Sequence, residues 1–203
     1  TLHCSSAASD VYKRQIKISI DTRSSEVINA FSSQNILFVN DVSSGFHDMN
    51  MLKTVSHLKC NYIMTHMPAE HQKGLNKKYN NVLDELNIFF NERIKSCIEQ
   101  GIEKEKIIID PGIGFGKSGD DNIKILENIN VLKSIHTNIC IGSSNKRFSS
   151  KLFDGIETKD DLKVANLATF AVSSLRGATY LRVHDVDITK DTIMIIDKVK
   201  NVS

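Results

Sequence analysis

Short apolar runs alternate with amphipathic stretches along the chain from Ile16 onward. This alternation is typical of repeated β-α units around a parallel sheet. The apolar runs predict six strands, at 17–21, 36–40, 62–65, 107–110, 138–141 and 179–183. The amphipathic stretches predict helices at 24–32, 47–58, 79–99, 122–134, 159–176 and 190–200. The fold class is therefore α/β, either a (β/α)8 TIM barrel or a doubly wound sheet.

Polar clusters at the ends of the apolar runs favour the barrel. Each predicted strand is followed by polar or charged residues, as in VNDVSSG, IDPGIGFGK and LRVHDV. In a barrel, the carboxyl ends of all strands meet at one mouth, where the chemistry is found. A doubly wound sheet would concentrate these residues at one switch point, and its GxGxxG fingerprint is absent from the sequence.

The first fifteen residues differ in character from the rest and show neither helical nor strand periodicity. We interpret 1–15 as a non-native or disordered tail, either a translated cloning adapter or an ordinary floppy terminus. Residues 16–203 are expected to form one domain, since 203 residues that are 40% hydrophobic suffice for one substantial core.

Charge and cysteine usage exclude several classes of protein. The formal charge of +2 provides no strong field for nucleic acid or an anionic membrane. Four scattered cysteines form no CxxC pair, which argues against a zinc site or a disulfide framework and favours a reduced, cytoplasmic setting. No apolar run approaches the roughly 18 residues that span a bilayer, and the first residues lack the apolar core of a secretory signal.

Three polar residues end different predicted strands, namely Asp21, Asn40 and Asp110. A carboxylate can accept two N–H bonds from an amino-pyrimidinone edge, and a carboxamide both donates and accepts. Together they suit a pterin or guanine-like ring. Each aspartate could instead cap the helix that follows it.

The segment DPGIGFGK at 110–117 is the most specific motif. Its glycines allow a ligand to approach the backbone closely, although a structural turn would explain them equally well. Phe115 among glycines is expected to be presented for stacking on a flat ring. Lys117 is expected to meet an anion or to be solvated.

Cationic residues follow the last two predicted strands. Arg182 and His184 are two residues apart on a predicted strand, so both would point to the same side and could hold a phosphate or diphosphate. The alternative is a buried pair of Arg182 with Asp185 or Asp187, beside a core histidine. Lys146 could donate to a ring carbonyl or polarise a leaving group, although a loop lysine is usually solvated. His66, Met67 and Cys140 are expected to be packing residues.

Taken together, these motifs resemble those of the dihydropteroate synthase family. The motifs stand in family order over about residues 16–200, as SIDT (19–22), NDVSSG (40–45), HM (66–67), DPGIGFGK (110–117), GSSNKRF (142–148) and GATYLRVHDV (177–186). The resemblance implies a transferase of folate biosynthesis that joins a dihydropterin diphosphate to p-aminobenzoate and releases diphosphate. It also implies a (β/α)8 barrel, an Mg²⁺ cofactor and a homodimer when full length.

Site roles follow from the same resemblance. It assigns Asp21, Asn40, Asp110 and Lys146 to the pterin, Phe115 and Lys146 to p-aminobenzoate, and Arg182 and His184 to diphosphate. Lys146, Arg182 and His184 would carry the catalytic work by electrostatic stabilisation. No metal ligand is expected in this chain, because the family's Asn ligand belongs to an earlier segment.

Two departures from the family pattern shape the expectations. Asn145 stands where the family usually has Arg, beside Lys146. About six of the eight β-α units are recognisable, so we expect an N-terminally truncated, incomplete barrel that is itself inactive. Two alternatives stay open: a methyltetrahydrofolate-binding methyltransferase module and a non-catalytic pterin-binding paralogue.

Overall fold

The structure is a computed structural model of the chain, and it describes residues 17–75, 77–143 and 158–200. Strands and helices alternate along it, which confirms the α/β class. The strands are β1 (Ile18–Asp21), β2 (Ile36–Asp41), β3 (Asn61–Thr65), β4 (Ile107–Asp110), β5 (Cys140–Ile141) and β6 (Tyr180–Leu181). The helices are α2 (Ser25–Ala30), α3 (Met51–Leu58), α4 (Ala69–Gln72), α5 (Val82–Glu99), the 3₁₀ turn η1 (Lys104–Lys106), α6 (Gly119–Glu127), α7 (Ile129–Leu132), α9 (Lys159–Leu175) and α10 (Val186–Lys200).

Each strand lies next to its neighbour in the chain. One sheet has the order β1-β2-β3-β4, and the other pairs β5 with β6. The β1-β2, β2-β3 and β5-β6 pairs are parallel, and a parallel bridge joins Ile109 to Ile139. Sequential parallel neighbours are the order of a (β/α)8 barrel, which confirms the predicted class. Six of its eight strands lie in the part of the chain that the structure describes.

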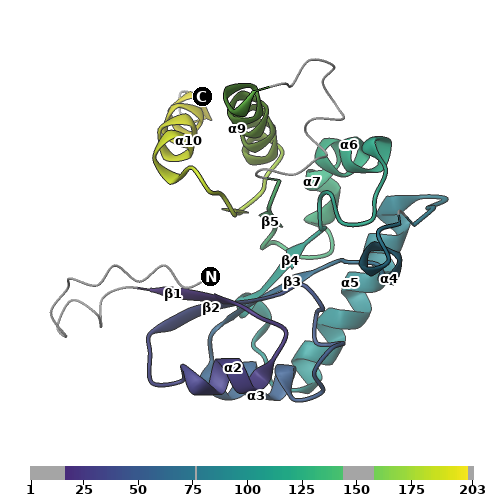
Figure 1. Ribbon diagram of the computed structural model, residues 1–203, viewed down its shortest axis with the longest axis vertical. Coiled ribbons are helices and arrows are strands. Elements are labelled where there is room, and N and C mark those ends of the chain that lie inside the picture. Colours follow the sequence, from purple (N-terminus) through teal and green to yellow (C-terminus); the bar gives the residue numbers. More distant parts are fainter. Residues whose placement is uncertain (1–16, 76, 144–157, 201–203) are drawn as a thin grey trace, which may run out of the picture. The chain divides into compact units, whose positions relative to one another are not determined.

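The chain divides into two compact units. The first unit comprises residues up to Thr65 together with Glu92–Ile108. In it, α2 and α3 lie on the same side of β1 and β2 (Figure 1). Its core is apolar and contains the fully buried side chains of Ile28, Val39, Met51, Val55, Tyr62 and Met64.

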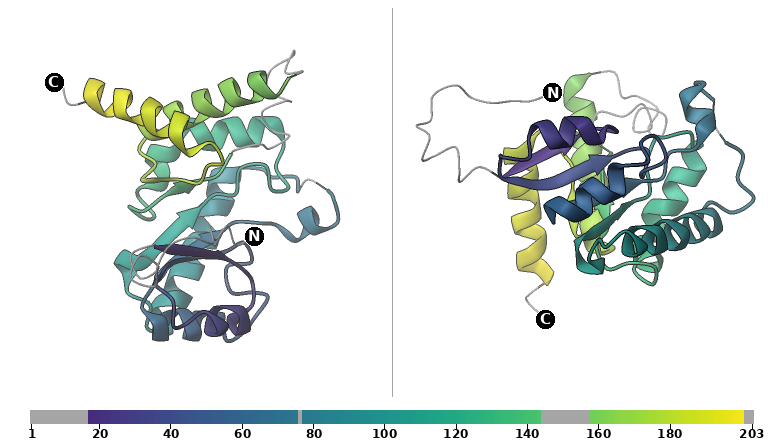
Figure 2. Two further views of the ribbon diagram at one scale, coloured as in Figure 1. Left: turned by 60° about the vertical axis from the view of Figure 1, so that its left-hand side comes forward. Right: turned by 90° about the horizontal axis from the view of Figure 1, so that it is seen from below.

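The second unit comprises His66–Asn91 and the residues from Ile109 onward. Helices α9 and α10 lie side by side in it, as both views of Figure 2 show. The core here includes the buried side chains of Phe90, Ile113, Ile125, Ile129, Ile139, Ile141 and Phe170. The expectation of one domain over 16–203 stays a prediction, and the predicted tail at 1–15 lies outside the described residues.

Capping side chains explain where two helices begin. The Ser118 hydroxyl accepts the backbone N–H of Asp121, and the Asp121 carboxylate accepts that of Ser118 in return. This capping box starts α6 at Gly119, three residues before the predicted start. The predicted helix at 122–134 also divides at Asn128 into α6 and α7. Thr158 and Asp161 form the equivalent box for α9.

Ser44 has a left-handed backbone with φ of 53°, which a residue with a side chain rarely adopts. Its buried hydroxyl donates to the Thr65 carbonyl at 2.9 Å. We expect Ser44→Ala to lower the free energy of unfolding by about 1 kcal/mol, because this bond is lost. Ser44→Gly should be nearly neutral, because relief of about 1 kcal/mol of backbone strain offsets the same loss. Urea unfolding of both variants checks this, and an unchanged Ser44→Ala would contradict it.

No helix in residues 17–75, 77–143 and 158–200 combines the length and apolar character needed to cross a membrane.

Cys60, Cys97 and Cys140 are buried free thiols. Burial raises the pKa of Cys97 to about 12. It also raises the pKa of Cys60. The thiols of Cys60 and Cys97 are therefore protonated at neutral pH.

Candidate functional site

The predicted site residues are distributed over both compact units. The first unit contains Asp21 and Asn40, and the second contains Asp110, Phe115, Arg182 and His184. Lys146 and the departure at Asn145 lie outside the described residues, and their predicted roles stay predictions.

Asp21 and Asn40 are neighbours across the first sheet. They are register partners in the parallel β1-β2 pair, and the backbone N–H of Thr22 donates to the Asn40 carbonyl at 3.1 Å. Asp21 is exposed, whereas Asn40 is 2% exposed. The ends of the two strands therefore lie next to each other in the sheet, and the predicted roles of Asp21 and Asn40 in pterin binding stay predictions.

Asp41 is a fully buried carboxylate that the sequence reasoning missed. It accepts the backbone N–H and the hydroxyl of Ser43 at 2.8 and 2.6 Å, the N–H of Gly45 at 2.7 Å and the phenol of Tyr62 at 2.8 Å. Burial, followed by the charge of Asp41, raises the pKa of Tyr62 far above its ordinary value. The signal was present as Asp-x-Ser, the pattern of an Asx turn. Asp41 therefore shapes the loop that follows Asn40.

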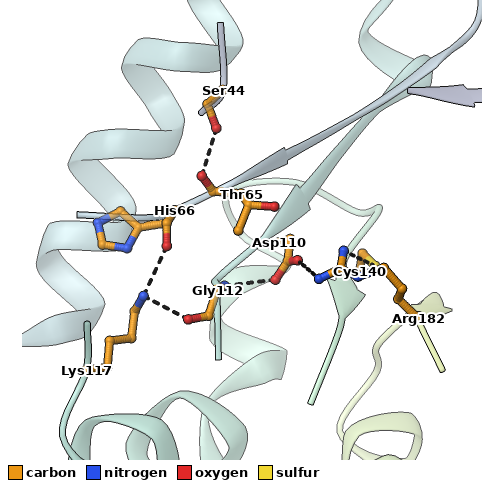
Figure 3. Close-up of polar contacts among 8 residues, drawn as sticks. All are labelled: Ser44, Thr65, His66, Asp110, Gly112, Lys117, Cys140 and Arg182. Atoms are coloured by element: carbon orange, nitrogen blue, oxygen red, sulfur yellow. Dashed lines mark hydrogen bonds and ion pairs between the residues drawn. The ribbon is translucent and has the colours of Figure 1, made fainter. Parts of the chain in front are cut away.

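The structure brings Asp110 and Arg182 together in the second unit. Asp110 ends β4 and is fully buried, and its Oδ2 accepts the Nη2 of Arg182 at 2.8 Å (Figure 3). Its Oδ1 accepts the backbone N–H of Gly112 at 2.8 Å. Arg182 is about one third exposed, and its Nη1 lies 3.9 Å from the Cys140 sulfur. A buried carboxylate and a partly exposed guanidinium thus form one polar centre, although the two residues are 72 positions apart in sequence.

Lys117 is buried, so the expectation that it would meet an anion or be solvated is wrong. Its ammonium donates to the carbonyls of His66 at 3.1 Å and Gly112 at 3.0 Å (Figure 3). It also donates to the carbonyl of Phe115 at 3.2 Å. An ammonium has three donors, and carbonyls from two loops converge on it here. Lys117 therefore joins the loop after β3 to the glycine-rich loop after β4.

Close approach between these two loops also explains one of the glycines. Gly112 has φ of 70°, and a Cβ at this position would overlap the His66 carbonyl oxygen. Glycine is thus required for both backbone conformation and space. The structural-turn alternative considered for DPGIGFGK accounts for this residue.

Phe115 is half-buried, and its ring meets that of His71 edge to face at 5.1 Å between centroids. Its carbonyl is held by Lys117, and its N–H donates to Gly112 at 3.0 Å. The ring is neither in the core nor free in solvent. Its predicted contact with p-aminobenzoate stays a prediction.

His66 is a packing residue, as predicted. It is 3% exposed, and its ring meets that of Phe89 edge to face at 4.8 Å. Burial, together with the charges of Lys117 and Lys77, lowers the pKa of His66 to about 2. Its imidazole is therefore neutral at physiological pH and carries no charge for anion binding. Cys140 is 1% exposed and is likewise a small buried side chain.

The prediction that Arg182 and His184 share one strand face is wrong. Strand β6 ends at Leu181, and both residues lie in the segment between β6 and α10. The period-2 alternation of a strand therefore does not apply to them. The alternative, a pair with Asp185 or Asp187 beside a core histidine, is wrong in its partner and in the histidine. Arg182 pairs with Asp110, and His184 is exposed.

Comparison with known proteins places this chain in a family. The sequence profile of the pterin binding enzyme family matches residues 6–184, most of the chain. The chain belongs to the pterin binding enzyme family. Its sequence is 32% identical over 194 residues to a mitochondrial folate synthesis bifunctional protein of Pisum sativum, and 30% identical over 183 residues to a dihydropteroate synthase of Synechocystis. These matches cover 90% of this chain, but 38% and 63% of the two relatives.

Solved structures of this family have the same fold. Dihydropteroate synthase of Xanthomonas albilineans, solved with 4-aminobenzoic acid, is 32% identical to this chain with a TM-score of 0.86. The match covers 95% of this chain and 71% of that one. The same enzyme with 7,8-dihydropteroate is 32% identical with a TM-score of 0.85 and is covered to 72%. The chain thus spans between about a third and two thirds of the curated relatives it matches, and somewhat more of the crystallised chains.

Proposed function

We propose that the whole protein is a dihydropteroate synthase. It condenses 6-hydroxymethyl-7,8-dihydropterin diphosphate with p-aminobenzoate to give 7,8-dihydropteroate and diphosphate. The observation that carries the proposal is the contact of the buried Asp110 carboxylate with the Arg182 guanidinium at 2.8 Å. One group accepts N–H donors of a pterin and the other attracts an anion, so the two halves of the substrate find complementary groups side by side. Relatives named as this enzyme support it.

Roles within the proposal follow the family resemblance. The Asp110 carboxylate accepts N–H bonds from the amino-pyrimidinone edge of the pterin. The family resemblance also assigns Asp21, Asn40 and Lys146 to the pterin. Arg182, one third exposed, offers its outer N–H groups to the diphosphate together with the exposed His184. Phe115 contacts the ring of p-aminobenzoate, and the family resemblance assigns Lys146 to the same ligand.

The reaction itself is a substitution at the methylene carbon of the pterin. The bond from this carbon to the diphosphate oxygen breaks, and its electron pair leaves with the diphosphate. The amine nitrogen of p-aminobenzoate forms the new bond with its lone pair and then loses a proton. No protein nucleophile is needed. The guanidinium of Arg182 stabilises the negative charge that grows on the leaving oxygen, and the ring contacts hold the two reactants in line.

Mg²⁺, a homodimer and a cytoplasmic setting complete the proposal. The family resemblance supports the first two, and the free cysteines support the reduced, cytoplasmic setting. Within the part of the chain that the structure describes, no three His, Cys, Asp or Glu side chains gather where they could hold a metal ion. The steps above use no metal ion.

Binding and turnover measurements test the proposal. The whole protein should release diphosphate only when the pterin diphosphate and p-aminobenzoate are both present. Arg182→Ala should weaken the binding of inorganic diphosphate about tenfold by isothermal titration, because a charge-assisted contact is removed. Arg176→Ala, an exposed position after α9, serves as the matched control and should leave binding unchanged.

Each alternative function has its own signature in these experiments. Binding of both substrates without release of diphosphate would sink the synthase proposal and favour a non-catalytic pterin-binding protein. Transfer of a methyl group from methyltetrahydrofolate to cobalamin would instead identify the methyltransferase module.

A further inference from the structure

Gly142, directly after β5, lies against the guanidinium of Arg182. A Cβ at Gly142 would overlap Nη2 of Arg182 and come within 2.7 Å of Cζ and 3.0 Å of Nε. These three guanidinium atoms are the nearest neighbours of that position. Its φ lies outside the left-handed region, so the backbone does not itself demand glycine. Glycine at position 142 therefore leaves space for the guanidinium of Arg182.

The guanidinium occupying this space is held from several sides. Its Nη2 donates to Oδ2 of the fully buried Asp110 at 2.8 Å, and its Nη1 faces the sulfur of Cys140 at 3.9 Å. The backbone N–H of Arg182 donates to the carbonyl of Ile141 at 2.9 Å, beside Gly142. The chain leading to Arg182 is thus anchored to β5, and the head group rests on the residue that follows.

A side chain at residue 142 would move Arg182 rather than the strand. The guanidinium terminates a flexible side chain, whereas β5 is paired with β6 and Ile141 is fully buried. Any rotamer that clears a new Cβ shifts Nη2, the atom bonded to Asp110. An added methyl group would therefore break the ion pair while leaving both charged residues in the sequence.

We infer that Gly142 is a positioning residue, which by lacking a side chain seats the guanidinium of Arg182 against Asp110. The consequence for binding rests on the proposed function. A seated guanidinium presents its outer N–H groups in one orientation, so less side-chain freedom is lost when an anion binds. Arg182 also neutralises Asp110 in the same position, which couples the pterin-binding and anion-binding halves of the centre.

A pair of glycine substitutions tests directly whether Gly142 positions the guanidinium of Arg182. Gly142→Ala adds the methyl group that meets Arg182, and Gly119→Ala adds one that meets nothing within 4 Å. Guanidinium NMR signals should show slow rotation about the Nε–Cζ bond of Arg182 in the unmodified protein and in the control variant Gly119→Ala. In Gly142→Ala the rotation should be fast. This readout needs no substrate, so it stands even if the proposed function fails. Unchanged rotation in Gly142→Ala would contradict the positioning role of Gly142.

A double-mutant cycle tests the consequence for binding. Gly142→Ala should weaken the binding of inorganic diphosphate about fivefold, because the side chain must then be ordered on binding. In an Arg182→Ala background, the same change should have no further effect, since the group it displaces is absent. Equal losses in both backgrounds would show that Gly142 acts on the fold and not through Arg182. If the unmodified protein binds no diphosphate, the proposed function fails. The rotation measurement alone then decides whether Gly142 positions Arg182.

Discussion

Replacing Lys117 with Met should lower the free energy of unfolding by about 3 kcal/mol, because its ammonium bonds to carbonyls at the junction of two loops. Hydrogen bonds from charged groups contribute about 1.5 to 3 kcal/mol each, and Lys117 makes three, of 3.0 to 3.2 Å. Met retains much of the side-chain volume, so most of the loss comes from the missing donors. Urea unfolding monitored by circular dichroism measures the change.

Lys124→Met provides the matched control for this variant. Lys124 is an exposed residue near the end of α6, so its replacement should change the stability by less than about 0.5 kcal/mol. Similar losses in the two variants would contradict the role given to Lys117. The loss should also appear as faster amide exchange in the glycine-rich loop, since Lys117 holds the carbonyls of Gly112 and Phe115 there.

His66 should make the protein less stable by about 2 kcal/mol at pH 5 than at pH 7. Its pKa is about 2 in the folded protein, against an ordinary value of 6.5, because it is buried near the positive charges of Lys117 and Lys77. The folded pKa is the lower one, so the unfolded chain takes up the proton first as the pH falls. Stability from neutral His66 is therefore present above about pH 6.5 and is lost progressively as the pH falls toward 2.

Unfolding in urea at pH 7, 6 and 5 measures this slope. His66→Phe keeps a ring opposite Phe89 and removes the titrating group, so about 2 kcal/mol of the pH dependence should disappear. His57→Gln, which changes an exposed histidine of α3, is the control and should retain the slope. A His66→Phe variant with the pH dependence of the unmodified protein would contradict the neutral, buried state.

Local patterns were sufficient to predict much of the fold. All six predicted strands are present, and β4 agrees with its predicted range because the isoleucines at 107–109 form a fully buried run. The ends of elements were less predictable. Residues 138 and 139 lie outside β5, where Thr179 bonds to both backbone groups of Ile139. Such a side-chain bond depends on a residue 40 positions away.

The candidate site was only partly predictable for the same reason. Asp110 and Arg182 could be identified separately by residue type and strand-end position, but their contact joins residues 72 apart. The strand that should have aligned Arg182 with His184 ends at Leu181, and this separates the two side chains. Lys117 appeared to be a surface residue because lysine is usually exposed, whereas carbonyls from two loops satisfy it in the interior.

By itself, the sequence determined the α/β class, the order of the elements and the residue types available for pterin and anion binding. These depend on hydrophobic periodicity and short motifs, which act within a few residues. Tertiary structure alone decided that Arg182 pairs with Asp110 above Gly142, that Lys117 joins two loops and that His66 is neutral. Those outcomes depend on burial and on distances between segments remote in sequence, since solvent exclusion determines the energies of charged groups.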